Sequence, residues 1–90
     1  MKTLRIKIKG LIQGIGFRNY IKQQAEKLSI RGHVRNLESG EVEVLAEGKD
    51  EDVNTMKKIC EKGAPHSQVK STDIQELNYI GFDDFKILKI

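Results

Sequence analysis

The sequence has little of what several classes of small protein require. Its 90 residues include one cysteine, Cys60, which cannot form an intramolecular disulfide or supply a structural zinc site by itself. The longest uncharged stretch near the start, Gly10–Phe17, is far shorter than the ~20 apolar residues of a transmembrane helix. Met1–Thr3 lead directly into a strand pattern, so we expect no signal peptide and a cytosolic location. Disulfide scaffolds, cysteine-based metal folds and membrane spans are therefore excluded.

Neither sign of charge is in large excess. Sixteen lysines and arginines against thirteen acidic residues give a net charge of +3 and an isoelectric point near 9.1, which slightly favours anionic partners. Positive and negative residues interleave along the chain, as on an ordinary solvated surface. The length and the 38% hydrophobic content predict one folded domain spanning residues 1–90.

Hydrophobic periodicity in the first half of the chain predicts a strand, a helix and a hairpin. Leu4, Ile6 and Ile8 alternate with basic residues, which is typical of a strand with one buried face. Three-and-four spacing of apolar residues then predicts a helix from Phe17 to about Ser29. The turn-rich cluster 38–41 separates two predicted antiparallel strands, Ile30–Leu37 and Val42–Glu47.

The second half of the chain repeats the pattern of helix and strand. Asp50 is predicted to cap a helix that Gly63 ends in a left-handed conformation, and Pro65 forbids its continuation. A strand over Val69–Leu77, a turn over Asn78–Asp84 and a terminal strand that begins at Phe85 and reaches Ile90 at most are predicted to follow.

This order of elements predicts an α+β fold. Strand, helix, strand, strand, helix, strand (βαββαβ) is the ferredoxin-like, split βαβ arrangement, in which two helices cover one face of an antiparallel sheet of four or five strands. Enzymes, RNA-binding domains, metal carriers and regulatory modules share this architecture, so the function must be argued from the site.

A glycine-rich turn before the first predicted helix indicates an anion site. Glycines allow successive backbone N–H groups to face one concavity, and the helix N-terminus adds unpaired donors and partial positive charge. Arg18 falls in the first helical turn, where a cation opposes the helix dipole unless a bound anion compensates. From this pattern alone, a phosphate site and an exposed arginine beside an ordinary turn both remain open. The candidate phosphate-binding residues are Gly14, Ile15, Gly16, Phe17 and Arg18.

Two common phosphate-binding motifs do not match. A Walker A loop ends in Gly-Lys-Ser/Thr, whereas Gly48 and Lys49 are followed by Asp50. The dinucleotide fingerprint requires a third glycine where this sequence has Asn19, and 90 residues leave little room for a doubly wound sheet. Nucleotide hydrolysis and dinucleotide binding by these routes are excluded.

Two segments together resemble the signature of the acylphosphatase family. They are Gly10–Arg18 (GLIQGIGFR) and Gly32–Asn36 (GHVRN), and Gly40 and Val42–Glu43 follow where that family carries similar residues. The resemblance implies hydrolysis of acyl phosphates to a carboxylate and inorganic phosphate, with no metal and no organic cofactor. It further implies that Arg18 and the backbone amides of residues 14–18 bind the phosphoryl group and that Asn36 orients the attacking water.

The sequence departs in places from the family motif, and several other residues that could carry chemistry are better explained by structural roles. His33 stands where the family often carries a bulky aromatic residue, and we give it no catalytic role. We interpret Arg35 as structural, because strand alternation turns it to the face opposite Asn36. Cys60 lies on an apolar helix stripe and is predicted to be buried, and His66 is predicted to be a surface residue without a metal.

Other functions on the same architecture also have expected signatures. The alternative to the enzyme is a non-catalytic phosphate-binding or regulatory module of the same fold. An RNA-binding domain would need aromatic platforms, whereas the strand Val42–Glu47 has no aromatic residue and carries two acids that would repel a nucleic acid. We expect a small-molecule acyl phosphate as substrate, no nucleic-acid or membrane partner, and a monomer.

Overall fold

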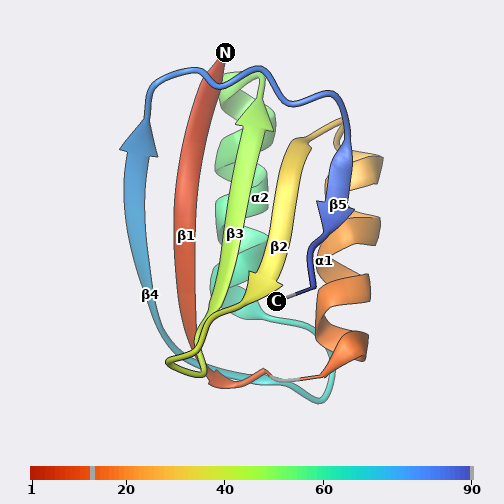
Figure 1. Ribbon diagram of the computed structural model, residues 1–90, viewed down its shortest axis with the longest axis vertical. Helices are drawn as coiled ribbons and strands as arrows, with labels where there is room; N and C mark the ends of the chain where they lie inside the picture. The colour runs from red at the N-terminus through yellow and green to blue at the C-terminus, as the bar shows by residue number, and fades with distance from the viewer. Residues whose placement is uncertain (13, 90) are drawn as a thin grey trace.

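Five strands form one sheet, and two helices cover one of its faces (Figure 1). The computed structural model describes residues 1–12 and 14–89; Gln13 of the glycine-rich motif and Ile90 lie outside the described residues. The elements are β1 (Lys2–Leu11), α1 (Ile15–Lys27), β2 (Arg31–Asn36), β3 (Val42–Gly48), α2 (Asp50–Lys62), β4 (Gln68–Leu77) and β5 (Phe85–Ile87). Neither helix of the described chain is long and apolar enough to span a membrane.

The sheet confirms the split βαβ arrangement, and its fifth strand, β5, confirms the predicted terminal strand that begins at Phe85. Its order is β4-β1-β3-β2-β5, and the first three neighbouring pairs are antiparallel. The prediction of an entirely antiparallel sheet is wrong at one edge, where β5 pairs with β2 in parallel. The segment after β4 crosses one end of the sheet before β5 begins, so β5 runs in the same direction as β2 (Figure 1).

The apolar core lies between the sheet and the helices, as the periodicity predicts. Leu4, Ile6 and Ile8 of β1 are each at most 4% exposed. The helices contribute their buried stripes, which comprise Phe17, Ile21 and Ala25 from α1 and Val53, Met56 and Cys60 from α2. Burial, with a smaller contribution from the charge of Glu61, raises the pKa of Cys60 to about 12, which leaves it a packing residue.

The helix boundaries differ from the predicted ones by two residues or fewer. α1 begins at Ile15 instead of Phe17, because Gly14 adopts φ 108° immediately before the first turn, and it stops before Ser29, whose φ is 55°. Asp50 lies inside α2 instead of capping it, and its carboxylate contacts the N-terminal amine at 3.4 Å. Gly63 ends α2 at φ 83° and ψ 175°, so the positive φ is confirmed although ψ lies outside the left-handed helical region.

A buried carboxylate links three strands on the face of the sheet opposite the helices. Glu43 of β3 is only 3% exposed. Its Oε2 accepts a hydrogen bond from Arg5 Nε at 2.7 Å, and its Oε1 accepts one from Arg35 Nε at 2.8 Å. The Oε1 atom also lies 3.0 Å from His33 Nε2. Burial alone would raise the pKa of Glu43, but these hydrogen bonds and the charge of Arg35 lower its pKa to about 2.

A second buried carboxylate fastens the segment between β4 and β5. Glu47 is 1% exposed and accepts a hydrogen bond from Thr3 Oγ1 at 2.5 Å. The backbone N–H groups of Ile80, Gly81 and Phe82 donate to the same carboxylate at 2.7 to 2.9 Å. Although burial acts in the opposite direction, these bonds lower the pKa of Glu47. The two acids of β3, which are expected from the sequence to repel a nucleic acid, are therefore buried and hydrogen bonded within the fold.

The Glu43 cluster predicts acid sensitivity of the fold. Because the pKa of Glu43 is about 2 in the folded protein, its ionised form stabilises the fold fully above the unfolded value of 4.5. This contribution is lost as the pH falls from 4.5 towards 2. We expect Glu43→Gln to lower the free energy of unfolding at pH 7 by about 3 kcal/mol, because it leaves two guanidinium groups without their carboxylate.

Urea unfolding followed by circular dichroism between pH 2 and pH 7 measures this effect. The stability difference between the parent and Glu43→Gln should shrink as the pH falls below 4.5. Glu38→Gln, on the exposed turn before the same strand, removes an equal charge and serves as the matched control. A difference between the parent and Glu43→Gln that stays constant down to pH 2 would contradict the prediction.

Candidate active site

The glycine-rich loop starts where β1 leaves the regular sheet. The register with β4 shifts between Lys9 and Gly10, and Gly10 adopts φ 150°. A Cβ at Gly10 would lie 2.0 Å from the carbonyl oxygen of Gln68, so this close approach of two backbones requires glycine. Gly14, the residue immediately before α1, adopts φ 108°.

The start of α1 has the features of an anion-binding helix terminus. Within the described residues, no acidic side chain lies in its first turn and no side chain caps its backbone N–H groups. Gly14, Ile15 and Gly16 are exposed, whereas Phe17 is 5% exposed and anchors the turn in the core. The free donors and the positive end of the helix dipole therefore face solvent on an anchored loop.

Arg18 lies in this first turn, where the sequence predicted it. Its Nε lies 3.5 Å from the carbonyl oxygen of Gly14, so the guanidinium folds back along the loop. This contact is at the long limit for a hydrogen bond and leaves most of the donor capacity of the guanidinium available. A bidentate partner such as two phosphate oxygens could use that capacity.

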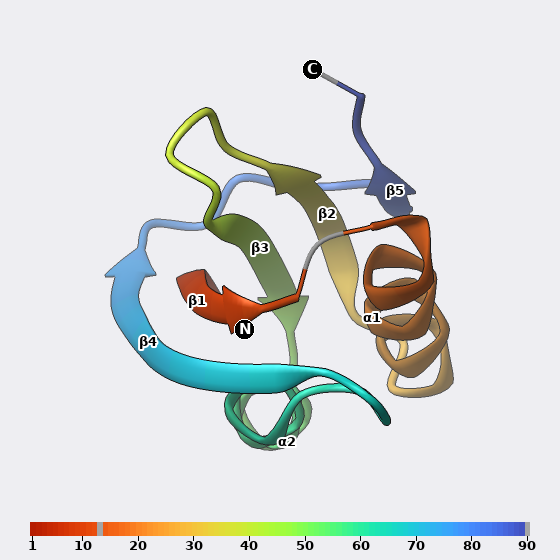
Figure 2. The same ribbon diagram turned by 90° about the horizontal axis from the view of Figure 1, so that it is seen from below.

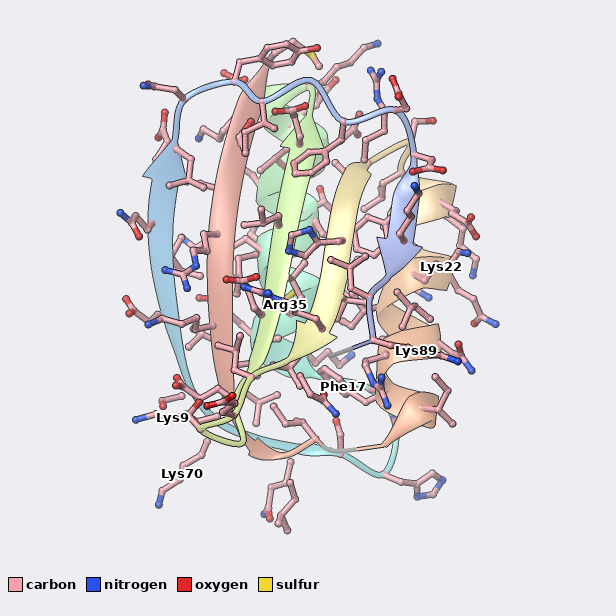
Figure 3. The ribbon with its side chains drawn as sticks, in the orientation of Figure 1. Lys9, Phe17, Lys22, Arg35, Lys70 and Lys89 are labelled. Atoms are coloured by element: carbon pink, nitrogen blue, oxygen red, sulfur yellow. The ribbon has the colours of Figure 1, made fainter. Side chains whose placement is uncertain are left out.

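Asn36 ends β2 with a buried acceptor that has no partner. It lies opposite Val42 in the β2–β3 register and follows Arg35, whose side chain lies on the outer face of the sheet (Figure 3). Strand alternation therefore turns Asn36 to the helix side. Its Oδ1 atom is buried and has no hydrogen-bond partner among residues 1–12 and 14–89. A buried, unpaired amide oxygen costs about 1–3 kcal/mol and is satisfied by a water or a ligand donor.

The fold brings the two predicted site segments to one end of the molecule. α1 packs against β2, and the start of α1 and the end of β2 both lie at the lower end in Figure 1. In the described chain, Arg18 and Asn36 do not hydrogen bond to each other, so each remains available to a ligand. The structure thus places the glycine-rich loop, Arg18 and Asn36 at one end of the fold.

The other candidate residues have structural environments. His33 lies 3.0 Å from Glu43 and packs edge-on against Phe82 at a ring-centroid distance of 5.9 Å. Arg35 bonds to Glu43, as its predicted structural role requires. His66 is exposed in the turn after α2, as predicted. No cluster of three or more His, Cys, Asp or Glu side chains suited to a metal occurs in the described residues.

Comparison with known proteins identifies the class to which this fold and loop belong. The acylphosphatase family profile matches residues 4–87. An acylphosphatase of Syntrophus aciditrophicus is 39% identical over 89 residues, which cover 98% of this chain and 93% of that protein. The crystal structure of acylphosphatase from Bacillus subtilis superposes with a TM-score of 0.93 at 32% identity, covering 99% of this chain and all of that chain. The chain belongs to the acylphosphatase family.

One further relative shows the same domain within a larger protein. A probable carbamoyltransferase HypF of Methanocaldococcus jannaschii is 42% identical over 88 residues, which cover 96% of this chain but only 11% of that protein. The domain thus occurs both as a short chain and as a small part of a long one.

Gly16 provides a test that separates the fold from anion binding. A Cβ at Gly16 would meet no atom within 4 Å in the described structure, and this glycine lies inside α1, where alanine is the better helix former by about 0.5–1 kcal/mol. We expect Gly16→Ala to leave the melting temperature unchanged or higher. The added methyl group would occupy space where a phosphate must approach the backbone, so phosphate affinity should fall at least tenfold, measured by competitive inhibition or calorimetry.

Gly14→Ala is the informative comparison for this variant. Its φ of 108° strains any side chain, so this substitution should lower both the melting temperature and phosphate affinity. If Gly16→Ala binds inorganic phosphate as tightly as the parent, the loop backbone is not the binding surface.

Proposed function

We propose that this chain hydrolyses acyl phosphates with a site built from the 14–18 loop, Arg18 and Asn36. Membership of the acylphosphatase family and the names of relatives of similar length support the activity. The observation that carries the site is the unpaired, buried Oδ1 of Asn36 at the same end of the fold as an uncapped helix terminus. The substrate is a small molecule, and inorganic phosphate is a product.

In this proposal, the loop holds the phosphoryl group. The backbone N–H groups at the start of α1 donate to its equatorial oxygens, and the Arg18 guanidinium donates from the side. These donors are held in place before the substrate arrives, so charge that develops on the phosphoryl oxygens is stabilised without reorganisation. Bound phosphate would also remove the repulsion between Arg18 and the helix dipole.

Asn36 would position the nucleophile. A water molecule that donates one hydrogen to the buried Oδ1 satisfies this acceptor and fixes the direction of the oxygen lone pair. The water oxygen attacks phosphorus, the bond between phosphorus and the bridging oxygen breaks, and the carboxylate leaves with the bonding electrons. An amide does not accept a proton near neutral pH, so the proton of the water passes to the phosphate product or to solvent.

The site requires no strong base because the leaving group is already good. A carboxylate has a conjugate acid with a pKa of about 4 and needs no protonation as it departs. Positioning of the water and stabilisation of the equatorial oxygens therefore carry the rate enhancement in this scheme. No resident metal or organic cofactor has a role in these steps.

The non-catalytic alternative is not favoured by the comparisons. The relatives of similar length are acylphosphatases, and HypF shows only that a similar domain also occurs within a longer protein. As part of the proposal we retain a cytosolic, monomeric enzyme formed by one domain over residues 1–90. The single cysteine, free and buried, is compatible with a reducing compartment.

Replacement of Asn36 separates water positioning from phosphate binding. With benzoyl phosphate as substrate, we expect Asn36→Ala to lower kcat by about 100-fold or more, because the attacking water loses its fixed orientation. Inhibition by inorganic phosphate should change less than threefold. Arg18→Ala should instead weaken phosphate inhibition by tenfold or more and also lower kcat/KM.

Matched controls are available on the same chain. Asn54→Ala on α2 and Arg31→Ala at the start of β2 remove the same groups at exposed positions away from the site, and both should retain parental kinetics. Circular dichroism confirms that each variant is folded. Absence of turnover by the parent protein, or full activity of Asn36→Ala, would contradict the proposed function.

A further inference from the structure

A pocket adjoins the proposed phosphate loop, and Asn36 is not part of its lining. Its volume is about 390 Å³, within the range of roughly 300–1,000 Å³ that is typical of small-molecule sites. Gly16 and Phe17 of the loop form part of its wall. The turn that joins α2 to β4, residues 64–67, forms the opposite wall. Arg18 and Asn36 lie outside its lining, so the pocket shares only the loop residues Gly16 and Phe17 with the proposed phosphate site.

The pocket combines an apolar base with neutral polar side chains. Ile12 and Phe17, both buried, supply apolar surface. The amides of Asn19 and Gln23 from α1 and the imidazole of His66 line it without a hydrogen-bond partner in the part of the chain that the structure describes. No Asp, Glu, Lys or Arg of the described chain contributes to its lining. Such a surface suits a neutral group that both packs and hydrogen bonds.

The opposite wall is held in a defined conformation. Ser67 Oγ donates a hydrogen bond to the carbonyl oxygen of Ala64 at 2.6 Å, and the N–H of Ser67 donates to the same oxygen at 3.1 Å. A Cβ at Gly63 would approach Ser67 Oγ to 2.7 Å, so the turn packs closely on its own beginning. The turn of residues 64–67 therefore forms a wall of the pocket that the fold itself holds in place.

The geometry of phosphoryl transfer directs the acyl group towards this pocket. The attacking and leaving oxygens lie roughly in line through phosphorus, so the acyl group departs on the side opposite the water. With the water at Asn36 and the loop around the equatorial oxygens, the acyl group lies on the side of the phosphorus opposite Asn36. In Figure 2 the end of β2 and the turn between α2 and β4 lie on opposite sides of a line from the end of β1 to the start of α1.

We propose that this pocket receives the acyl group and selects short acyl chains that carry a neutral hydrogen-bonding group, such as a hydroxyl or a carboxamide. The inference rests on the proposed function, because it takes the phosphoryl group to be held by the 14–18 loop. Gln23 lies one turn further along α1 than Asn19 and on the same side, so in this proposal it meets the part of the acyl group more distant from the phosphate.

A matched substrate pair tests this selectivity. Butyryl phosphate and 3-hydroxybutyryl phosphate differ by one hydroxyl group, and the ratio of their kcat/KM values reports recognition of that group independently of phosphate binding. We expect the parent to prefer the hydroxylated substrate about threefold to tenfold, as one hydrogen bond between neutral groups supplies. Gln23→Leu, which keeps the side-chain size and removes the amide, should bring the ratio close to one.

The control and the outcomes separate this proposal from the proposed function. Gln24→Leu makes the same replacement one position along α1, outside the pocket, and should retain the parental ratio. Turnover of both substrates with equal kcat/KM in the parent, or an equal ratio in the parent and Gln23→Leu, would overturn the pocket assignment while leaving acyl phosphate hydrolysis intact. Hydrolysis of neither substrate would overturn the proposed function and the pocket assignment together.

Discussion

The Glu43 carboxylate joins β1, β2 and β3 on the face of the sheet that no helix covers. Its bonds to Arg5 and Arg35 hold β1 and β2 against the central strand β3, and loss of either bond would leave a buried charge with fewer partners. Because Arg35 is held on this face, strand alternation holds Asn36 on the other. The direction of the proposed water-positioning side chain is thus determined by an ion pair on the opposite surface of the sheet.

Two backbone constraints bring the remainder of the site to the same end of the fold. The register of β1 against β4 shifts at Gly10, β1 ends at Leu11, and Gly14 with its positive φ immediately precedes α1. Phe17 then anchors the first helical turn in the core. The glycine loop is in this way held between a strand and a helix, which fixes the positions of its backbone donors even in a small protein. Acyl phosphates suit such a site because their leaving group needs no acid catalyst.

The sequence predicts the fold and site where a residue pattern directly reflects local geometry. Alternation of Leu4, Ile6 and Ile8 identifies the core face of β1, and the spacing of Phe17 and Ile21 identifies that of α1. The positions of Arg18 and Asn36 at the site end also follow from the paired motif. Their roles in binding and catalysis remain predictions.

Features that depend on distant partners could not be read from the sequence. An acid in a strand is ordinarily a solvated residue, so from the sequence Glu43 and Glu47 are expected to repel a nucleic-acid backbone. Their burial depends on Arg5, 38 residues away, and on the Ile80–Phe82 amides, 33 to 35 residues away. The parallel pairing of β5 and the pocket beside the loop likewise arise only when segments far apart in the chain come together.

The Glu47 carboxylate has a consequence for the order in which the chain acquires its structure. It binds Thr3 near the beginning of the chain and three backbone amides near its end. During synthesis on a ribosome, β1, β2 and β3 emerge before residues 80–82. Until those residues arrive, burial of Glu47 would leave a charge with a single side-chain partner, which opposes closure of this part of the sheet. Closure of the sheet around Glu47 is therefore coupled to the docking of residues 80–82.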